Sequence, residues 1–317
     1  MTLRTRRFQQ VDVFTATPYW GNALAVVLDG TDLSDAAMQR FARWTHLSET
    51  TFVLPPTQPE ADYRVRIFTP GGELPFAGHP TLGTCHAWLA AGGKPRHIRQ
   101  SGEGAVVVQE CKVGLVTIRA SGDQLAFQAP ALTRSAPTAE VLDPVVQALG
   151  LSSEQILSVQ LLNNGPQFLG LLLDDPQTVL AVNPRHDVLQ ALNLKVGIAA
   201  RYPIDEPPEH PVLISRSNRE ARAFSNTAAT TTTGPTPDLE VRVFVAPSGV
   251  PEDPVTGSFN ASLAQWLMAD GLMPTRYIAA QGRVLGRAGR VYLSQDAQGQ
   301  VWVGGQVVTC VDGTVRL

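Results

Sequence analysis

The sequence Glu73-Leu-Pro-Phe-Ala-Gly-His-Pro80 lies at the centre of the stretch that decides the fold, residues 63–92. Before it, residues 63–68 alternate apolar and polar side chains, which predicts a half-buried strand. After it, residues 80–91 are small or apolar on every side, which predicts a buried helix that begins near Pro80. A strand, a tight glycine turn and a buried helix N-terminus expose free backbone N–H groups with partial positive charge. The stretch therefore predicts a site for a carboxylate.

The chain contains this arrangement twice. A second strand and a Pro-Ser-Gly loop lead to Glu252-Asp-Pro-Val-Thr-Gly-Ser258, and a second apolar helix follows. A shift of 179 residues matches Glu73, Pro75, Gly78, His79 and Gly92 with Glu252, Pro254, Gly257, Ser258 and Gly271. Upstream, Arg66-Ile-Phe68 matches Arg242-Val-Phe244 with a shift of 176 residues. Recurrence of a Glu, a Pro and a Gly in one register, between a strand and a helix, predicts two lobes of related design.

Many short strands linked by turns, with few helices and no βαβ order, indicate an α+β protein. We expect two pseudo-symmetric lobes, each a curved, mostly antiparallel sheet or barrel around a central buried helix. Linker composition in residues 129–137 divides the chain into an N-terminal lobe, residues 1–129, and a C-terminal lobe, residues 130–308. The last strand, residues 309–317, is a candidate for returning to the N-terminal lobe.

Helical spacing of apolar residues after Asp32 predicts a helix that is capped by Asp32 or Ser34 and ends near His46. Ser48 and Glu49 then fall at the junction between this helix and a short strand. Two more helices are expected at 144–150, where Asp143 would cap Pro144, and at 183–192.

Alternating or apolar runs predict strands near residues 7–14, 23–28, 103–111, 113–120, 124–129, 156–162, 167–173, 196–201 and 211–216. Three further strands close the chain. The Thr-rich stretch 226–237 has no apolar period, which predicts a mobile surface loop.

Size and charge exclude several classes of protein. The 317 residues suffice for two domains, each with its own core. The net charge of −3 gives no general attraction to nucleic acid or to an anionic membrane. No apolar run reaches the length of a membrane span and no signal peptide is recognised, so the cytoplasm is the expected compartment. The cysteines, Cys85, Cys111 and Cys310, show neither metal spacing nor a disulfide framework.

Cofactor motifs are absent from the sequence. The glycines of Gly78-His-Pro-Thr-Leu-Gly83 lack the Lys-Ser/Thr of a P-loop, and no dinucleotide fingerprint occurs. The six histidines show no ligand spacing, so neither a cofactor nor a metal is expected. The nucleophile elbow Gly-x-Ser-x-Gly is also missing. What remains is proton transfer by carboxyl groups and His79. The candidate acids are Glu49, Glu73, Glu252 and Asp253.

Each candidate has a structural alternative. His79 opens a helix after a turn glycine, which fits a ligand-facing residue and a plain N-terminal surface residue equally well. The recurrence of Glu73 and Glu252 favours a structural bond to turn N–H groups at least as much as catalysis. Asp253 has no counterpart in the first copy, and such asymmetry is expected of a substrate-specific contact. The structural alternative for Asp253 is a cap or an Asx-turn. By its local pattern alone, Glu49 is a surface carboxylate.

Four motifs resemble the PhzF-like (phenazine biosynthesis) isomerase family, which has the fold of diaminopimelate epimerase. They are Gly21-Asn-Ala-Leu-Ala-Val-Val27, Ser48-Glu-Thr-Thr-Phe52, Phe68-Thr-Pro-Gly-Gly-Glu-Leu-Pro-Phe-Ala-Gly-His-Pro-Thr-Leu-Gly83 and Glu252-Asp-Pro-Val-Thr-Gly-Ser258. They follow the family's order, and the resemblance covers nearly the whole chain. Ala23 departs from the proline that is usual in the family, for which we expect only a local change in the turn.

The resemblance implies an active site between the lobes, with Glu49 as the proton-transferring acid and base. It implies that His79 and Asp253 act beside Glu49 and bind or polarise the substrate. Substrate contacts are implied for Asn22, Ser48, Gly78, Gly257 and Ser258. Related epimerases and racemases use one cysteine at each helix N-terminus. Those positions are here Ala77 and Thr256, which excludes two-thiol racemisation.

The resulting hypothesis is an isomerase without a cofactor that moves a proton between carbons of a small, cyclic carboxylate. Burial in a closed cleft would raise the pKa of Glu49 above the value of about 4.3 for a free Glu. The alternatives are a non-catalytic protein that binds small acids on the same fold and an epimerase of an unrelated metabolite. The expected partners are a small anionic substrate and, by resemblance, a second copy of the chain in a homodimer.

Overall fold

The computed structural model describes residues 3–98, 104–203 and 235–317. The elements of the first half are β1 (Thr5–Val13), β2 (Asn22–Val27), α1 (Asp35–Thr45), β3 (Thr50–Leu54), β4 (Tyr63–Phe68), β5 (Glu73–Leu74), α2 (Gly78–Ala90), β6 (His97–Ile98), β7 (Ala105–Cys111), β8 (Gly114–Ser121) and β9 (Gln124–Gln128). None of the helices within the described ranges is long and apolar enough to cross a membrane.

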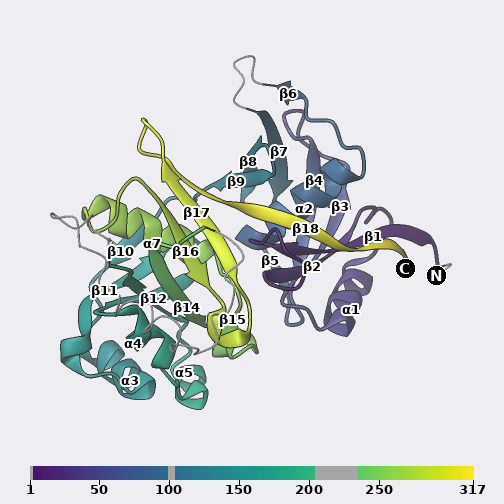
Figure 1. Cartoon of the computed structure of the whole chain (residues 1–317). Helices are drawn as coiled ribbons and strands as arrows, with labels where there is room; N and C mark the ends of the chain where they lie inside the picture. The colour runs from purple at the N-terminus through teal and green to yellow at the C-terminus, as the bar shows by residue number, and fades with distance from the viewer. Residues whose placement is uncertain (1–2, 99–103, 204–234) are drawn as a thin grey trace, which may run out of the picture.

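The second half begins with β10 (Thr133–Ser135), α3 (Ala139–Leu149), η1 (Ser153–Gln155), β11 (Ile156–Asn163), β12 (Gln167–Leu173), α4 (Pro176–Ala181), α5 (His186–Ala191) and β13 (Val196–Arg201). It continues with β14 (Leu239–Phe244), η2 (Ala246–Ser248), β15 (Glu252–Asp253), α7 (Gly257–Ala269), β16 (Arg276–Gln281), η3 (Arg283–Leu285), β17 (Gly289–Gln295) and β18 (Val301–Arg316). Figure 1 shows β18 running from the side of β17 across to β1.

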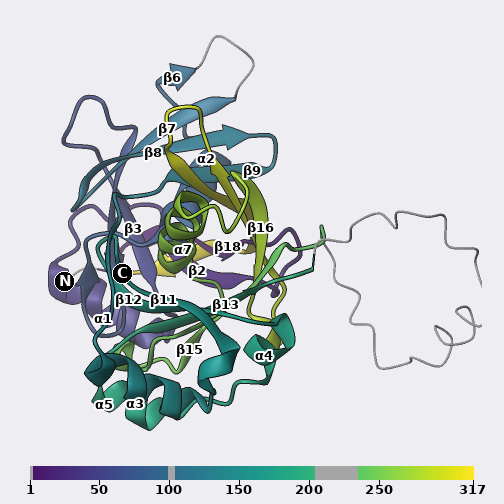
Figure 2. The same ribbon diagram turned by 90° about the vertical axis from the view of Figure 1, so that its left-hand side faces the viewer.

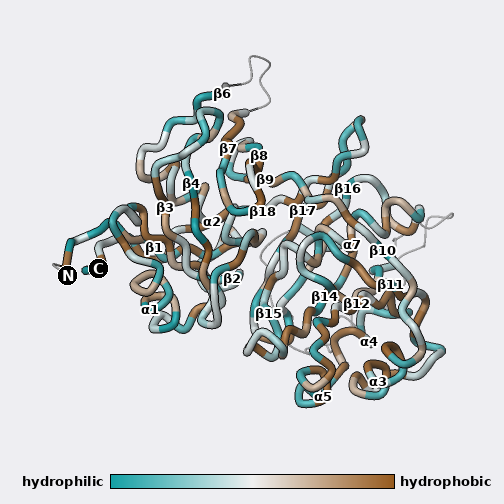
Figure 3. Tube along the Cα trace, turned by 180° about the vertical axis from the view of Figure 1, so that it is seen from behind, coloured by the Kyte–Doolittle hydropathy of each residue, from teal (hydrophilic) through white to brown (hydrophobic). Residues whose placement is uncertain are grey.

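Strands from the first half form a closed barrel in a mixed sheet. The pairing runs β1, β2, β3, β4, β7, β8, β9 and β18, and β18 pairs again with β1. All of these pairs are antiparallel except β2–β3 and β4–β7. Helix α2 contacts β1, β2, β3, β7, β9 and β18 and is buried along most of its length, as its apolar composition predicts. Figure 3 shows hydrophobic and hydrophilic residues mixed along α2 and the strands around it, as expected for strands with one buried face.

The remaining strands continue the same sheet. From β18 the pairing passes through β17, β16, β14, β13, β12 and β11 to β10. Helix α7 contacts β11, β17 and β18. The helices α3, α4 and α5 pack together with β12, β13 and β14 in a separate hydrophobic cluster, on one side of these strands (Figures 1 and 2). The two buried helices are therefore linked by β18, which contacts both.

The internal repeat keeps its register in three dimensions. Helices α2 and α7 begin at Gly78 and Gly257 and end at Ala90 and Ala269, so the shift of 179 residues holds at both ends. Their N-termini touch, because a Cβ atom added to Gly78 would lie 3.1 Å from the Cα of Gly257. Glycine is required at this contact, since any side chain would push the two helix ends apart.

Several local predictions are confirmed. Helix α1 is capped by Ser34, whose Oγ accepts a hydrogen bond from the Ala37 backbone N–H. Strands lie within a few residues of the predicted positions wherever those fall in the described ranges. The strand predicted at 211–216 and residues 226–234 of the Thr-rich stretch lie outside the described residues.

Other predictions are wrong in detail. Helix α3 begins at Ala139 after the N-cap Thr138, so Pro144 lies inside it. The proline is tolerated because its missing N–H would have bonded the carbonyl of Glu140, a solvent-exposed residue. The stretch 129–137, predicted as a linker, contains the strand β10, which pairs with β11. Helix α5 begins at His186 instead of residue 183, and the short helix α4 was not predicted.

Candidate active site

Four of the predicted site residues meet in one cluster although they are far apart in the sequence. The Nε2 atom of His79 lies 3.4 Å from Oε2 of Glu49. The amide nitrogen of Asn22 donates to Oδ1 of Asp253 at 2.9 Å and lies 3.4 Å from Nδ1 of His79. Asn22 also donates to the Val255 carbonyl at 3.0 Å. One asparagine therefore bridges the N-termini of both repeats.

The fold explains why these residues converge. Strands β2 and β3 pair in parallel, so Asn22 at the start of β2 and Glu49 just before β3 lie toward the same end of the sheet. His79 is the second residue of α2, and Asp253 belongs to the short strand β15 before α7. Because the N-termini of α2 and α7 touch, they bring His79 and Asp253 to the same place.

His79 is neutral at neutral pH. Its side chain is almost completely buried, and this burial lowers the pKa of His79 to about 4 against the opposing charges of Asp253 and Asp12. The Asn22 amide has two hydrogens, which it donates to Asp253 and to the Val255 carbonyl, so its 3.4 Å contact with Nδ1 of His79 does not fix the tautomer. Nε2 is the ring nitrogen that is close to Glu49.

The His79–Glu49 pair has unused hydrogen-bonding capacity. Despite the separation of 3.4 Å, Nε2 of His79 and Oε2 of Glu49 are both buried and make no hydrogen bond with a described residue. The Oγ atom of the neighbouring Ser48 is likewise buried and makes no well-aligned hydrogen bond with a described residue. A buried polar group without a partner costs about 1–3 kcal/mol, so such groups are rare and call for an explanation. A polar ligand that lies beside both atoms would satisfy them.

Both carboxyl groups bind protons more tightly than usual. Burial raises the pKa of Glu49, against the effects of the Ser48 hydroxyl and the Lys195 ammonium. Burial and the charge of Glu49 raise the pKa of Asp253 to about 6. Two neighbouring carboxyls in a buried site disfavour double ionisation. A group with a pKa nearer to neutrality is suited to both accepting and donating a proton.

The Asp253 turn is held by residues that the sequence did not single out for this purpose. The Thr256 hydroxyl donates to Oδ2 of Asp253 at 2.7 Å. The side-chain amide of Gln281 donates to the Asp253 carbonyl and to Oγ1 of Thr256, each at 3.0 Å. Its oxygen accepts from the Thr256 backbone N–H at 3.0 Å. Gln281 ends a strand and lies in no motif, so no sequence signal identified it.

The remaining predicted residues lie around this cluster. Gly78 and Gly257 form the contact between the helix N-termini, where free backbone N–H groups give partial positive charge. The Ser258 carbonyl accepts a hydrogen bond from the Asn164 amide at 2.9 Å. Asn164 was not predicted, and its own Oδ1 is buried with no hydrogen-bond partner among the residues that the structure describes.

Glu73 and Glu252 do not belong to the cluster. Each is held by the arginine of the preceding strand through two hydrogen bonds, at 2.8 and 2.7 Å for Arg66–Glu73 and at 2.9 and 2.8 Å for Arg242–Glu252. A structural role is therefore correct for both, but the predicted partner, the turn N–H groups, is wrong. Among the described residues, no group of three His, Cys, Asp or Glu side chains is arranged to hold a metal ion.

Comparison with known proteins gives a consistent result. A family model described as phenazine biosynthesis-like protein matches residues 11–313. Trans-2,3-dihydro-3-hydroxyanthranilate isomerase of Pseudomonas fluorescens is 33% identical over 97% of this chain and 98% of its own. Antisense-enhancing sequence 1 of Schizosaccharomyces pombe is 31% identical over 96% of this chain and 97% of its own.

Solved structures share the fold. The crystal structure of a Bacillus anthracis phenazine biosynthesis protein of the PhzF family superimposes with a TM-score of 0.76. The alignment covers 99% of this chain and 100% of that one at 22% identity, which shows a common architecture.

Proposed function

The chain belongs to the phenazine biosynthesis-like family and is an isomerase, and from this premise we propose that it moves a proton between two carbons of a small cyclic carboxylate without a cofactor. One observation carries the proposal. A neutral histidine, His79, and a carboxyl group of raised pKa, Glu49, lie 3.4 Å apart, and their facing atoms are buried without a hydrogen-bond partner in the described parts of the chain.

Glu49 would act first as a base and then as an acid. As a carboxylate it removes a proton from one carbon, and the electron pair of the broken C–H bond delocalises into the conjugated system of the substrate. As a carboxylic acid it then returns the proton to a second carbon on the same face, which regenerates the carboxylate. The proton and electrons balance without an oxidant or reductant. The raised pKa of Glu49 makes its protonated form less unfavourable than that of an exposed Glu, which suits a group that must both accept and donate a proton.

The surrounding groups would hold the substrate. We propose that the N-termini of α2 and α7, at Gly78 and Gly257, bind the substrate carboxylate through backbone N–H groups and stabilise the charge that develops in the intermediate. The Nε2–H of His79 would donate to the substrate. The hydroxyls of Ser48 and Ser258 are the proposed contacts for further polar groups.

Asn22 and Asp253 would fix the position of this machinery, because Asn22 joins the two repeats and Asp253 anchors the second. We also propose that the repeats mark two lobes with a boundary near residues 129 and 130, and that the end of β18 returns to the first lobe. The pairing of β18 with both β1 and β17 supports this arrangement. We further propose a homodimer, which light scattering tests against the 34.0 kDa mass of one chain.

The test is incubation in D₂O with cyclic amino and hydroxy acids, followed by NMR. The panel includes trans-2,3-dihydro-3-hydroxyanthranilate, the compound in the name of the Pseudomonas fluorescens relative. We expect a positional isomer, or deuterium at one carbon, with the wild-type protein and not with Glu49→Gln. Ligands that bind without any chemical change after long incubation would support the non-catalytic alternative instead.

A further inference from the structure

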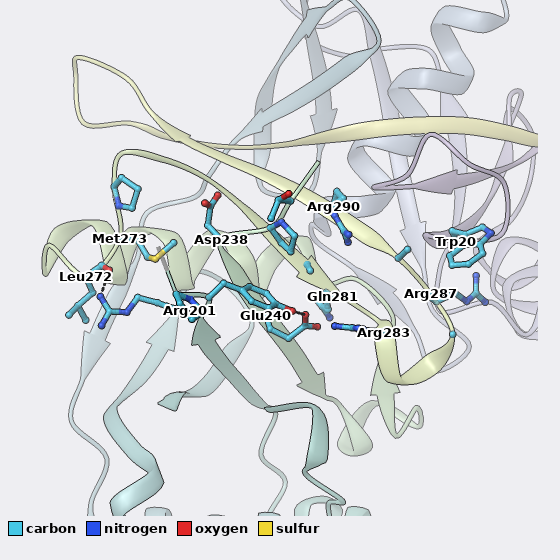
Figure 4. A pocket seen from close by; sticks show the side chains of 18 residues that line it. Trp20, Arg201, Asp238, Glu240, Leu272, Met273, Gln281, Arg283, Arg287 and Arg290 are labelled. Carbon is cyan, nitrogen blue, oxygen red and sulfur yellow. Dashed lines mark hydrogen bonds between the residues drawn. The ribbon is translucent and has the colours of Figure 1, made fainter. Parts of the chain in front are cut away.

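A cavity of about 910 Å³ lies outside the cluster of Glu49, His79 and Asp253. Its lining residues come from the ends of β13, β14 and β16, from η3 with the residues after it, and from Trp20 before β2. Figure 4 shows Trp20 at one end and Leu272 and Met273 at the other. This volume is in the range of small-molecule sites, which combine apolar walls with a few placed polar groups.

The cavity collects positive charge although the chain is negative overall. Its lining includes four arginines, Arg201, Arg283, Arg287 and Arg290, against the two carboxyls of Asp238 and Glu240. The net charge of the whole chain is −3. A local excess of arginine in a recess favours an anionic ligand.

None of these four arginines has a carboxylate partner within the described part of the chain. Arg290 is only 7% exposed and donates to the carbonyls of Pro235 and Gly289, at 3.1 and 3.0 Å. Arg283 is exposed, forms no ion pair with a described residue, and interacts with the Tyr202 hydroxyl. Arg201 and Arg287 donate to backbone carbonyls. A guanidinium has five N–H donors, so Arg283 keeps donors for an anion besides its contact with Tyr202.

Glu240 supplies a hydrogen-bond acceptor for the same ligand. It is 1% exposed, and its Oε2 accepts a hydrogen bond of 2.6 Å from the Tyr202 hydroxyl. Its Oε1 is buried and has no partner among the described residues. Burial raises the pKa of Glu240, against the Tyr202 hydroxyl and the charges of Arg283 and Arg290. Figure 4 shows the end of the Arg283 side chain beside Glu240. A carboxyl oxygen in this state requires a hydrogen-bond donor.

We propose that this cavity is a second ligand site for a small organic anion that carries a ring and a hydroxyl or amino group. The anionic group would bind Arg283, the hydroxyl or amino group would donate to Glu240, and the ring would lie against the apolar part of the lining. Gln281 lines the cavity, while its side-chain amide holds the Asp253–Thr256 turn, so it forms the wall between the two sites. The proposal does not depend on the reaction assigned to Glu49.

Isothermal titration of the full chain with 3-hydroxybenzoate and with benzoate tests the proposal. The two probes share the ring and the carboxylate, but only the first has a donor for Glu240. We expect 3-hydroxybenzoate to bind more tightly than benzoate, because only this probe satisfies Oε1 of Glu240. Arg283→Ala should weaken the binding of both probes about tenfold, as expected for a lost charge-assisted hydrogen bond.

Two control variants separate this cavity from other sites. Arg276→Ala removes an exposed arginine of β16 that does not line the cavity, and it should leave affinity unchanged. Because both probes resemble the substrate proposed for the Glu49 site, Glu49→Gln identifies binding that belongs to that site instead. The proposal is overturned if neither probe binds, if benzoate binds as tightly as 3-hydroxybenzoate, if Arg276→Ala weakens binding as much as Arg283→Ala, or if Glu49→Gln weakens binding and Arg283→Ala does not. Thermal melts establish that each variant is folded.

Discussion

Replacing Gly78 with alanine tests whether the contact between the two helix N-termini sets the geometry of the site. The added Cβ would lie 2.8 Å from Cζ of Phe127 and 3.1 Å from the Cα of Gly257. Phe127 is fully buried and packs edge-on against Phe76 at a centroid distance of 5.6 Å, so its ring has little room to move. The strain must therefore be relieved in part by separating the N-termini of α2 and α7.

The expected magnitude follows from this geometry. Overpacking of a buried site costs about 1–3 kcal/mol, which lowers Tm by a few degrees in a chain of this size. His79 directly follows the substituted residue, so a shift of the helix end moves its imidazole relative to Glu49. A displacement of about 1 Å in a catalytic site can cost about 100-fold in rate. For a smaller shift we expect kcat/KM to fall about tenfold.

Gly83→Ala is the matched control in the same helix. Its Cβ would lie 2.6 Å from Cδ2 of Leu24 and 2.9 Å from Cγ2 of Val13, so it also overpacks the core, but away from the helix N-terminus. Circular-dichroism melts and kcat/KM on the substrate identified in D₂O are measured for both variants. We expect both to lose stability and only Gly78→Ala to lose activity. Wild-type kcat/KM in Gly78→Ala, or an equal loss in Gly83→Ala, would refute the reasoning.

Three further predictions concern the repeat, the carboxyl pair and the support of the turn. Glu252→Gln leaves the charge of the buried Arg242 uncompensated and should lower the free energy of unfolding, measured by urea denaturation, by about 3–5 kcal/mol. Glu73→Gln, at the more exposed pair, should lower it by only about 1 kcal/mol. Equal losses in the two variants would contradict the role of burial. As pH falls through about 6, protonation of Asp253 should reduce kcat/KM while His79, with a pKa of about 4, stays neutral. The folded chain binds this proton more tightly than the unfolded chain, so the wild type should gain stability relative to Asp253→Asn as the pH falls through about 6. A wild-type Tm that falls relative to the Tm of Asp253→Asn over this interval would contradict the prediction. Gln281→Glu removes the donor to the Asp253 carbonyl and should lower kcat/KM about tenfold. An unchanged kcat/KM would show that the Asp253–Thr256 turn does not need this hydrogen bond.

The sequence predicted the two buried helices because their signals are local. A turn glycine, a proline and a run of small or apolar residues define each N-terminus, and the repeat doubled that signal. The register predicted from Glu73 and Glu252 therefore holds at Gly78 and Gly257. The recurring Arg66 and Arg242 also carried the information that each Glu has a partner. The pairing was missed because the two residues lie on different strands, whose register no local pattern sets.

Long-range contacts were beyond the reach of the sequence pattern. The hydrogen bond from Asn22 to Asp253 spans 231 residues, and only a family resemblance suggested that both belong to one site. Gln281 is far from Thr256 in the sequence and contacts it only in the folded chain. Its role depends on its burial, and a polar residue at the end of a strand gives no sequence signal of burial. The start of helix α3 was predicted too late, because Pro144 is a stronger sequence signal for a helix start than Thr138, the residue that precedes the helix.

Proton transfer by Glu49 is the central claim, and one measurement tests it most directly. Glu49→Gln keeps the shape of the side chain and removes its acid–base capacity. NMR in D₂O measures the rate of isomer formation and of deuterium entry for the wild type and the variant, on a substrate that the wild type converts. We predict a loss of about 100- to 10,000-fold in a variant that melts like the wild type. Turnover within a few-fold of wild type would contradict the account.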